Sequence, residues 1–359
     1  MPGLARRSPS PRHLPPHERS AVTATHTPTG TARVPGLISV IIPAYNQEPY
    51  INDALDSLAA QRLGRHRLQV IVVDDHSSDL TPTLVQDYRD RFEDLRLITH
   101  PENRGVSAAR NTGLAAATGS YVTFLDPDDW FSRDHLASLA DGLERLEVDF
   151  VRCDQVRVRG TSRSIHRAPQ ALHNVVLDPR EDILPVDAAS MIDYPYVFTG
   201  MYRHDVLGDT QWFDPALATC EDRPWLWRLY LSSTSYAVVG EASQFYRRNL
   251  PGSLTQVFDE RQLHFIPAFG QIVQLVSQDR EADRFLPKAL RQFFAIACHH
   301  LDRIGQFPAA LAAELRRQLG AALAQLPPGP MAQALEQLDP RRRKLLRTVY
   351  TPPPVGVGA

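Results

Sequence analysis

The sequence has few cysteines, no long apolar run and almost no excess of charge of one sign. Its three cysteines, Cys153, Cys220 and Cys298, are widely spaced and form no CxxC pair, so neither a disulfide framework nor a structural zinc site is expected. The net charge of -2 disfavours nucleic acid as a partner. No apolar run reaches the roughly eighteen residues of a conventional membrane span. We therefore expect a cytoplasmic protein with an ordinary hydrophobic core.

Three common catalytic and nucleotide-binding motifs are also missing. The sequence contains neither GxGxxG after its first apolar run nor GxxxxGK[ST], which disfavours a dinucleotide oxidoreductase and a P-loop NTPase. It lacks GxSxG, the nucleophile turn of many serine hydrolases. The chemistry must therefore come from other residues.

Proline marks both ends of the chain. Of the 29 prolines, seven lie in residues 1–36 and seven lie after Leu326. The first 36 residues also hold five arginines and one glutamate with little apolar periodicity, so we expect a disordered basic tail there and no secretory signal. Residues 349–359 are expected to form a second flexible tail.

Between the tails, short apolar runs alternate with helical periodicity. The runs 37–43, 68–74, 95–99 and 121–126 are typical of strands buried on both faces of a parallel sheet. Apolar residues at positions 51, 54, 55 and 58 predict one helix, and a second helix over 108–118 is expected to end at Gly119. This alternation predicts an α/β fold with a mostly parallel open sheet flanked by helices.

A polar cluster follows each predicted strand. The four clusters are residues 43–46, 74–77, 103–105 and 126–129. In open parallel sheets, ligands bind beyond the carboxyl ends of the strands. We therefore expect a ligand site where these clusters meet.

The residue types in these clusters suggest a nucleotide and a metal. Asp126 and Asp128 lie at i and i+2, so extended backbone would point both carboxylates to one side as ligands for Mg²⁺ or Mn²⁺; the same residues also suit a simple turn. Asp75 could accept the imino N–H of a uracil ring or cap a helix. Arg104 and Arg110 offer cations for a nucleotide, although for Arg110 a solvated or salt-bridged surface position is favoured.

Three segments occur in order along this half of the chain. They are SVIIPAYNQEPYINDALDSLAAQ, VIVVDDHSSDLT and NRGVSAARNTGLAAATGSYVTFLDPDDW. Together they resemble the nucleotide-sugar half of family 2 glycosyltransferases, which have the GT-A fold, over residues 37–150. The resemblance implies an inverting transferase that uses a nucleotide diphosphate sugar, most often a UDP-sugar, with a divalent metal, in polysaccharide or cell-envelope biosynthesis.

The resemblance also assigns site residues in this half. The donor nucleotide would contact Pro43, Ala44, Tyr45, Asn46, Asp75, Arg104 and Asp126. Asp126 and Asp128 match the family's DxD motif, with Asp128 as the preferred metal ligand and Asp126 nearer the ribose.

Residues 151–258 would form the acceptor-binding and catalytic half. By resemblance, Asp222 is the general base, with Glu221 in reserve; taken alone, an Asp before Pro224 at a helix start is more often an N-cap. Arg247 or Arg248, in a segment that continues to Thr255, would reach the leaving diphosphate.

Residues 259–348 are expected to be helical and to support the acceptor half. Their basic run at 341–347 suits a solvated helix end first, and attraction to an anionic inner membrane leaflet second. The expected reaction is sugar transfer to a hydroxyl of a glycan or a lipid-linked acceptor. The alternative is a non-catalytic nucleotide-sugar-binding scaffold of the same fold; a nucleotidyltransferase would need a glycine-rich loop after the first strand.

Overall fold

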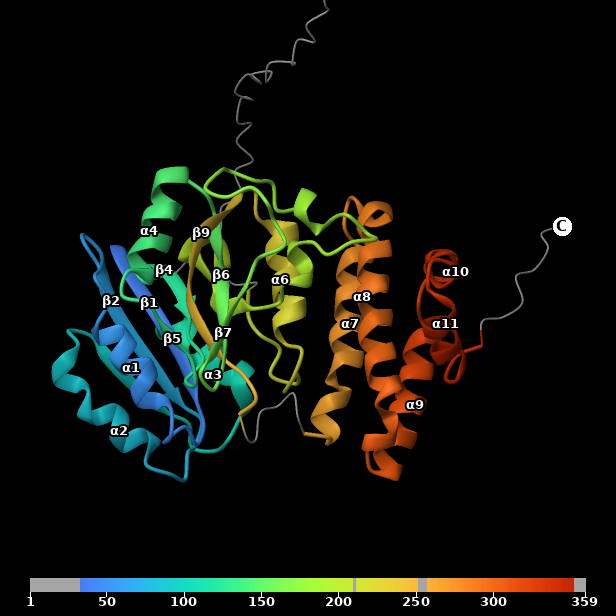
Figure 1. Ribbon diagram of the computed structural model, residues 1–359, viewed down its shortest axis with the longest axis horizontal. Coiled ribbons are helices and arrows are strands. Elements are labelled where there is room, and N and C mark those ends of the chain that lie inside the picture. The colour runs from blue at the N-terminus through green and yellow to red at the C-terminus, as the bar shows by residue number, and fades with distance from the viewer. Residues whose placement is uncertain (1–32, 209–210, 251–256, 352–359) are drawn as a thin grey trace, which may run out of the picture. The chain divides into compact units, whose positions relative to one another are not determined.

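A nine-stranded sheet forms the centre of the protein. The computed structural model describes residues 33–208, 211–250 and 257–351, with the side chains of 241 and 242 excepted. Its strands are β1 (Val34–Ala44), β2 (Arg67–Asp74), β3 (Leu95–Thr99), β4 (Gly119–Phe124), β5 (Trp130–Phe131), β6 (Phe150–Arg159), β7 (Ser162–His166), β8 (Gly200–Arg203) and β9 (Tyr236–Arg247). They are ordered β3-β2-β1-β4-β8-β6-β9-β5, and β7 pairs with β6 (Figure 1).

The four strands predicted from the sequence are present and pair in parallel as β3-β2-β1-β4. Beyond β4 the sheet is mixed, because β8 runs antiparallel to β4 and β6, and β5 runs antiparallel to β9. The predicted tail boundary at residue 36 is wrong. Strand β1 already begins at Val34, whose N–H donates to the carbonyl of Thr118 at 2.9 Å, just before β4.

Helices cover both faces of the sheet. They are α1 (Ile51–Ala59), α2 (Thr81–Asp87), α3 (Gly105–Ala116), α4 (His135–Leu146), α5 (His204–Leu207), α6 (Asp222–Ser232), α7 (Phe265–Ser277), α8 (Ala282–Asp302), α9 (Ala309–Ala324), α10 (Pro328–Glu336) and α11 (Pro340–Arg347). Short 3₁₀ helices are η1 (Arg89–Arg91), η2 (Glu181–Ile183), η3 (Met191–Asp193), η4 (Val197–Thr199), η5 (Glu260–His264) and η6 (Ile304–Gln306). The residues predicted to be the apolar side of α1 are its buried residues.

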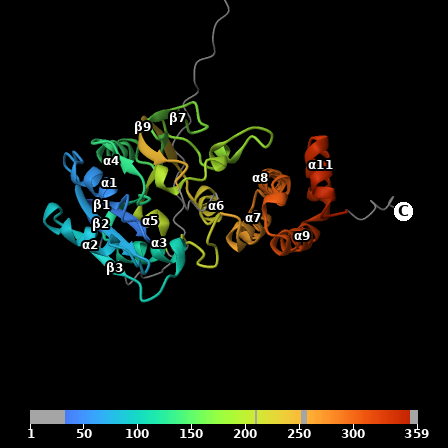
Figure 2. The same cartoon turned by 60° about the horizontal axis from the view of Figure 1, so that its bottom comes forward.

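Alternate residues of β1 belong to two separate hydrophobic clusters, one on each face of the sheet. Ile38, Val40 and Ile42 pack with α1 and α4. Ile41 packs on the opposite face with α3 and α6, and that cluster continues without interruption through α7 and α8 to Leu346. The carboxyl-terminal helices therefore share the core of the sheet domain, and Figure 2 shows them following α6 away from the sheet.

Glycine lets α3 lie close to the sheet. A Cβ at Gly113 would lie 2.3 Å from Cγ2 of Ile41, so only glycine permits this approach. The expectation that Gly119 ends the helix is wrong, because α3 ends at Ala116 and Gly119 is the first residue of β4. A Cβ at Gly119 would lie 2.4 Å from the carbonyl oxygen of Leu37, which explains the glycine.

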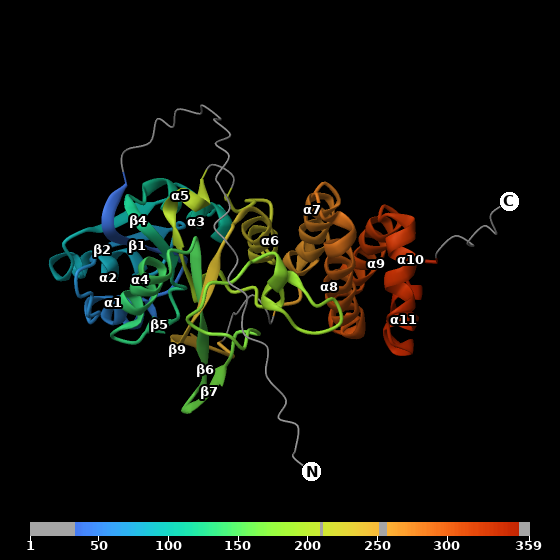
Figure 3. The same ribbon diagram turned by 90° about the horizontal axis from the view of Figure 1, so that it is seen from above.

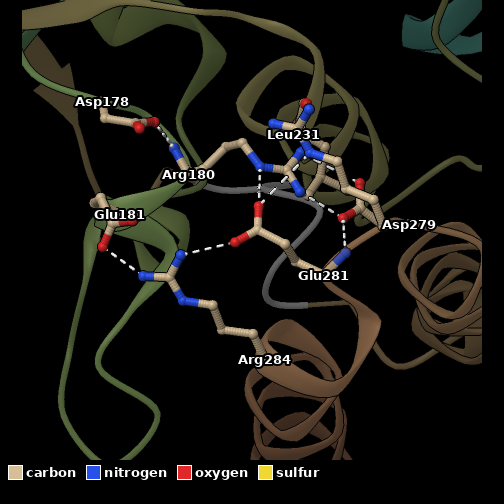
Figure 4. A network of polar contacts seen from close by, with 8 residues as sticks. Asp178, Arg180, Glu181, Leu231, Asp279, Glu281 and Arg284 are labelled. Atoms are coloured by element: carbon tan, nitrogen blue, oxygen red, sulfur yellow. Dashed lines mark hydrogen bonds and ion pairs between the residues drawn. The ribbon is translucent and has the colours of Figure 1, made fainter.

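A buried arginine joins the helical region to the rest of the chain. The guanidinium of Arg180, which lies just before η2, donates to the carboxylates of Asp279 and Glu281 and to the carbonyl of Leu231 at the end of α6 (Figure 4). Arg284 in α8 adds an ion pair to Glu181. These contacts attach the start of α8 to both α6 and the segment after β7.

The basic run at 341–347 lies on α11. Leu346 is its buried residue, Arg341 pairs with Asp302, and Arg343 donates to the carbonyl of Glu336. This arrangement agrees with a solvated helix that packs against the core through one apolar side chain. Attraction of its basic residues to an anionic membrane stays a prediction.

Neither expected tail can be followed in full. Residues 1–32 and 352–359 lie outside the described residues, but Val349 and Tyr350 pack against the core, so the second tail does not begin at 349. In the part of the chain that the structure describes, no helix is long and apolar enough to cross a membrane.

Candidate active site

The four polar clusters meet at the carboxyl edge of the parallel strands. The backbone N–H of Asn46 donates to Oγ of Ser77 at 2.9 Å, and Oδ1 of Asn46 accepts from the N–H of Ser78 at 2.8 Å. Asn46 has a φ of 51°, in the left-handed region that asparagine tolerates. Local side-chain bonds therefore fix the loops after β1 and β2 to each other.

The predicted nucleotide-binding residues of the first cluster differ in exposure. Pro43 and Ala44 are the last residues of β1 and both are buried. Tyr45 is 47% exposed, and Asn46 is exposed as well. Tyr45 and Asn46 are thus the two members of this cluster whose side chains are open to a ligand.

Asp75 is buried and its carboxylate binds the backbone at the amino-terminal end of α3. Its Oδ1 accepts from the N–H of Arg104 at 2.9 Å, and its Oδ2 accepts from the N–H of Gly105 at 2.7 Å. His100 Nδ1 lies 2.7 Å from Oδ1. The carboxylate therefore caps α3, while the side chain of Arg104 is exposed.

Arg110 lies at the centre of the site. The guanidinium is buried: Nη1 donates to Glu221 and to Asp222, each at 2.8 Å, and Nη2 donates to Asp126 at 3.1 Å. Burial alone would lower the pKa of Arg110, but Asp222, Asp126 and Glu221 together raise it. The expectation of a surface position for Arg110 is wrong, because three carboxylates from two segments compensate the buried charge.

One signal for Arg110 was present in the sequence. Arg110 precedes Gly113 and Leu114 by three and four residues, so it lies on their side of the helix, which is the buried side. An arginine on a buried helix face must find anions.

Asp222 does not cap its own helix. Helix α6 begins at Asp222, and Glu221 occupies the N-cap position without a side-chain cap bond. Oδ1 of Asp222 accepts a hydrogen bond from Arg110. Its Oδ2 accepts from the backbone N–H of Val197, at the start of η4, over 3.5 Å. Burial, despite the opposing charge of Arg110, raises the pKa of Asp222 to about 8, with Glu221 and Asp126 adding to the rise.

A second group of carboxylates follows β4. Burial, and then the charge of Asp126, raises the pKa of Asp128 to about 6. Asp129, which sequence analysis did not single out, is fully buried; its Oδ1 accepts from the N–H of Arg247 at 2.7 Å, and its Oδ2 has no partner among the described residues. Hard oxygen donors that repel one another fit a divalent cation, which would offset that repulsion.

The two predicted diphosphate arginines point in different directions. Arg247 pairs with Asp53 at 2.6 Å and lies over the rings of Tyr50 and Trp130, beside α1. Arg248 donates to the hydroxyl of Tyr246 at 3.0 Å. The segment 252–255, which the same prediction included, lies outside the described residues.

An open sheet with polar loops at the carboxyl ends of its parallel strands, a DxD-type acidic pair and an acidic helix start are features of a GT-A glycosyltransferase domain. Residues 39–207 match the family described as glycosyl transferase family 2. Residues 39–207 therefore form a domain of this family.

Relatives and solved structures agree with this assignment. An uncharacterized glycosyltransferase, EpsJ, of Bacillus subtilis (strain 168) is 32% identical over 62% of this chain and 63% of its own length. The poly(ribitol-phosphate) beta-N-acetylglucosaminyltransferase TarS of Staphylococcus aureus (strain MW2) is 29% identical over 60% of this chain and 36% of its own length. The chain thus spans less than two thirds of the curated relatives it matches first. The crystal structure of S. aureus TarS 1-349 in complex with UDP-GlcNAc has a TM-score of 0.70 at 22% identity and covers 87% of this chain and 90% of that chain, which supports the fold.

Proposed function

We propose that the chain is an inverting glycosyltransferase that moves a sugar from a UDP-sugar to a hydroxyl of a glycan or lipid-linked acceptor. The family assignment supports sugar transfer from a nucleotide donor. The solved TarS structures, described as complexes with UDP and with UDP-GlcNAc, support uridine as the nucleotide.

The observation that carries the proposal is the position of Asp222. One buried guanidinium, that of Arg110, joins Asp222 to Asp126. In this proposal Asp222 removes the acceptor hydroxyl proton as that oxygen attacks the anomeric carbon, opposite the diphosphate, so one displacement inverts the configuration. A pKa of about 8 makes Asp222 a stronger base than an ordinary carboxylate.

The remaining residues bind and orient the donor. Asp126 and Asp128 would hold Mg²⁺ or Mn²⁺, which supplies positive charge for the departing diphosphate. Tyr45 and Asn46 would border the nucleotide, and Asp75 would accept from the base through a free lone pair of its carboxylate. Arg248 would donate to the diphosphate.

The test compares turnover with donor binding. We expect Asp222→Asn to lower the rate of sugar transfer about 10³-fold. It keeps the side-chain size and should leave calorimetric binding of UDP with Mn²⁺ intact. Glu221→Gln, which also loses a carboxylate next to Arg110, is the matched control and should retain more activity.

Asp128→Ala separates the donor site from the base. We expect this variant to lose the Mn²⁺-dependent part of UDP binding, with GDP, CDP and dTDP as comparison nucleotides. If UDP bound and no UDP-sugar were ever turned over, the chain would be a non-catalytic nucleotide-sugar-binding protein. If no nucleotide bound the folded protein, the assignment of the donor site would be wrong.

A further inference from the structure

The outer part of the hairpin formed by β6 and β7 is basic, and its nearest acidic residue, the buried Asp154 of β6, is paired with Arg167 at 3.4 Å. From Gln155 to Leu177 the sequence holds four arginines, two histidines and no aspartate or glutamate. Figure 3 shows β7 and the end of β6 projecting beyond the other strands. We call residues 155–167 the basic hairpin.

The strand register divides the hairpin arginines between its two faces. Arg157 is paired with Tyr246 of β9, so these two side chains lie on one face. Arg159, two residues further, lies on that face as well. Arg163 is paired with Val158 and stacks on Phe245, which places it on the opposite face.

Arg157 is half-buried and lacks a carboxylate partner within the described residues. Its Nη2 donates to the hydroxyl of Tyr196 at 3.0 Å, and its Nε is buried without a hydrogen-bond partner. Arg110 and Arg180 are paired with carboxylates, whereas the fully buried Arg152 is enclosed by the chain and donates to the carbonyl of Tyr194 and the hydroxyl of Thr199. Arg157 differs from all three because it is partly open to solvent. A partly desolvated cation whose contacts are neutral is suited to an anion from outside the chain.

The same face carries one more cationic group, Arg248, and a histidine, His166. Arg248 stacks on Tyr246 at 5.1 Å and donates to its hydroxyl. Burial lowers the pKa of His166, and the charges of Arg157 and Arg248 lower it further, so both guanidiniums act on one ring. This clustering of cations is stable only while solvent or an anion screens it.

Aromatic side chains connect this face to the reaction centre. Tyr196 lies 5.9 Å from Tyr246, and Phe198 lies 5.2 Å from Tyr246, centroid to centroid. Between Tyr196 and Phe198 is Val197, whose N–H faces Asp222. A chain lying along these rings would extend from the base to the basic hairpin.

We propose that the acceptor is an anionic glycan, bearing phosphate or carboxylate groups, and that Arg157 and Arg159 bind its charged groups next to the reacting hydroxyl. Planar guanidinium groups match both anions through paired hydrogen bonds. The proposal rests on the proposed function, because it names the acceptor class of that same site.

Binding of defined oligomers to the full chain tests this, with UDP and Mn²⁺ present. The probes are oligo(glycerol phosphate), oligogalacturonate and a neutral maltooligosaccharide. We expect one or both anionic oligomers to bind, and to bind more weakly as salt rises from about 0.05 M to about 0.5 M. The double variant Arg157→Gln/Arg159→Gln should lose about tenfold in affinity for them.

Two further variants make the result specific. Arg163→Gln removes a charge from the opposite face of the same hairpin and should bind as the unaltered protein does. Arg157→Lys keeps the charge and loses the planar fork, so its affinity for the anionic oligomers should lie between those of the unaltered protein and the double variant. UDP affinity should be the same in all of them.

The proposal is overturned by any of three results: neither anionic oligomer binds, the neutral oligomer binds equally well, or Arg163→Gln weakens binding as much as the double variant. Failure of UDP to bind would instead contradict the donor site, and the comparison of oligomers would still decide the acceptor class.

Discussion

At the scale of single residues, Arg110 determines the charge state of the site. It contacts the carboxylates assigned to the base, to its neighbour and to the DxD pair. Without this guanidinium, the pKa of Asp222 would rise above its value of about 8, and less of the base would be unprotonated at neutral pH.

We therefore expect Arg110→Gln to lower kcat at pH 7 about 100-fold and to move the acidic limb of the pH profile of kcat to higher pH. Measuring kcat between pH 6 and about 9 checks this. Arg110→Lys keeps a cation and should shift the limb less. An unchanged pH profile with lower kcat would show that Arg110 acts only on the position of these groups.

The acidic residues of the site were easier to predict from the sequence than the residues that contact them. Asp126 and Asp128 stand out because they follow an apolar strand. Asp129 gains its significance from a contact across 118 residues, in which it accepts from the N–H of Arg247. Tyr246 gains its significance from ring contacts with Tyr196 and Phe198, which also lie far away in the chain. No local pattern encodes such contacts.

At the scale of elements, α3 depends on one carboxylate from another loop. Its N-cap residue makes no side-chain cap bond, and Asp75 accepts from the N–H groups of Arg104 and Gly105 instead. Asp75→Asn keeps one acceptor oxygen and loses the charge. We expect it to lower the free energy of unfolding by about 1–2 kcal/mol in urea titrations and to weaken UDP binding.

Asp87→Asn is the control for this prediction, because Asp87 is an exposed residue at the end of α2. It should change stability by less than about 0.5 kcal/mol. A fall in UDP affinity without loss of stability in Asp75→Asn would show a contact to the base and no capping role.

The parallel strands were predictable because both of their faces are buried, which produces continuous apolar runs such as that of β2. The order of the later strands was not. β8 has four residues and β5 has two, so neither is long enough to show a repeating pattern of apolar residues. Their partner strands also lie far away in the chain. Gly119 was misassigned because a glycine after a helix suits both a cap and a close strand contact.

At the scale of the whole molecule, the sheet and the carboxyl-terminal helices share one core. Lys288 in α8 is fully buried; its Nζ donates to the carbonyls of Pro185 and Ala188 and pairs with Asp193 at 2.6 Å. Lys288→Met would leave Asp193 without its cation. We expect the free energy of unfolding to fall by about 3 kcal/mol. Unfolding in urea should remain a single transition.

Arg291→Met, also on α8, provides the comparison. Arg291 is more exposed than Lys288, and its hydrogen-bond partners among the described residues are the carbonyl groups of Ala188 and Asp187. Its loss should cost under about 1 kcal/mol. Two separate transitions in either variant would mean that the helices unfold independently of the sheet, contrary to the continuous core.

The joining of β7 to the sheet through β6 has a consequence for how such enzymes can diversify. Asp222, the proposed base, is the first residue of α6, whose Trp225 and Trp227 are buried in the core, whereas β7 pairs with β6 and faces solvent. If the hairpin binds the acceptor as proposed, substitutions, insertions or a transplanted turn at its tip would change which acceptor is recognised and leave the chemical step as it is. Selection for new acceptors can therefore act on a part of the chain that folding constrains little.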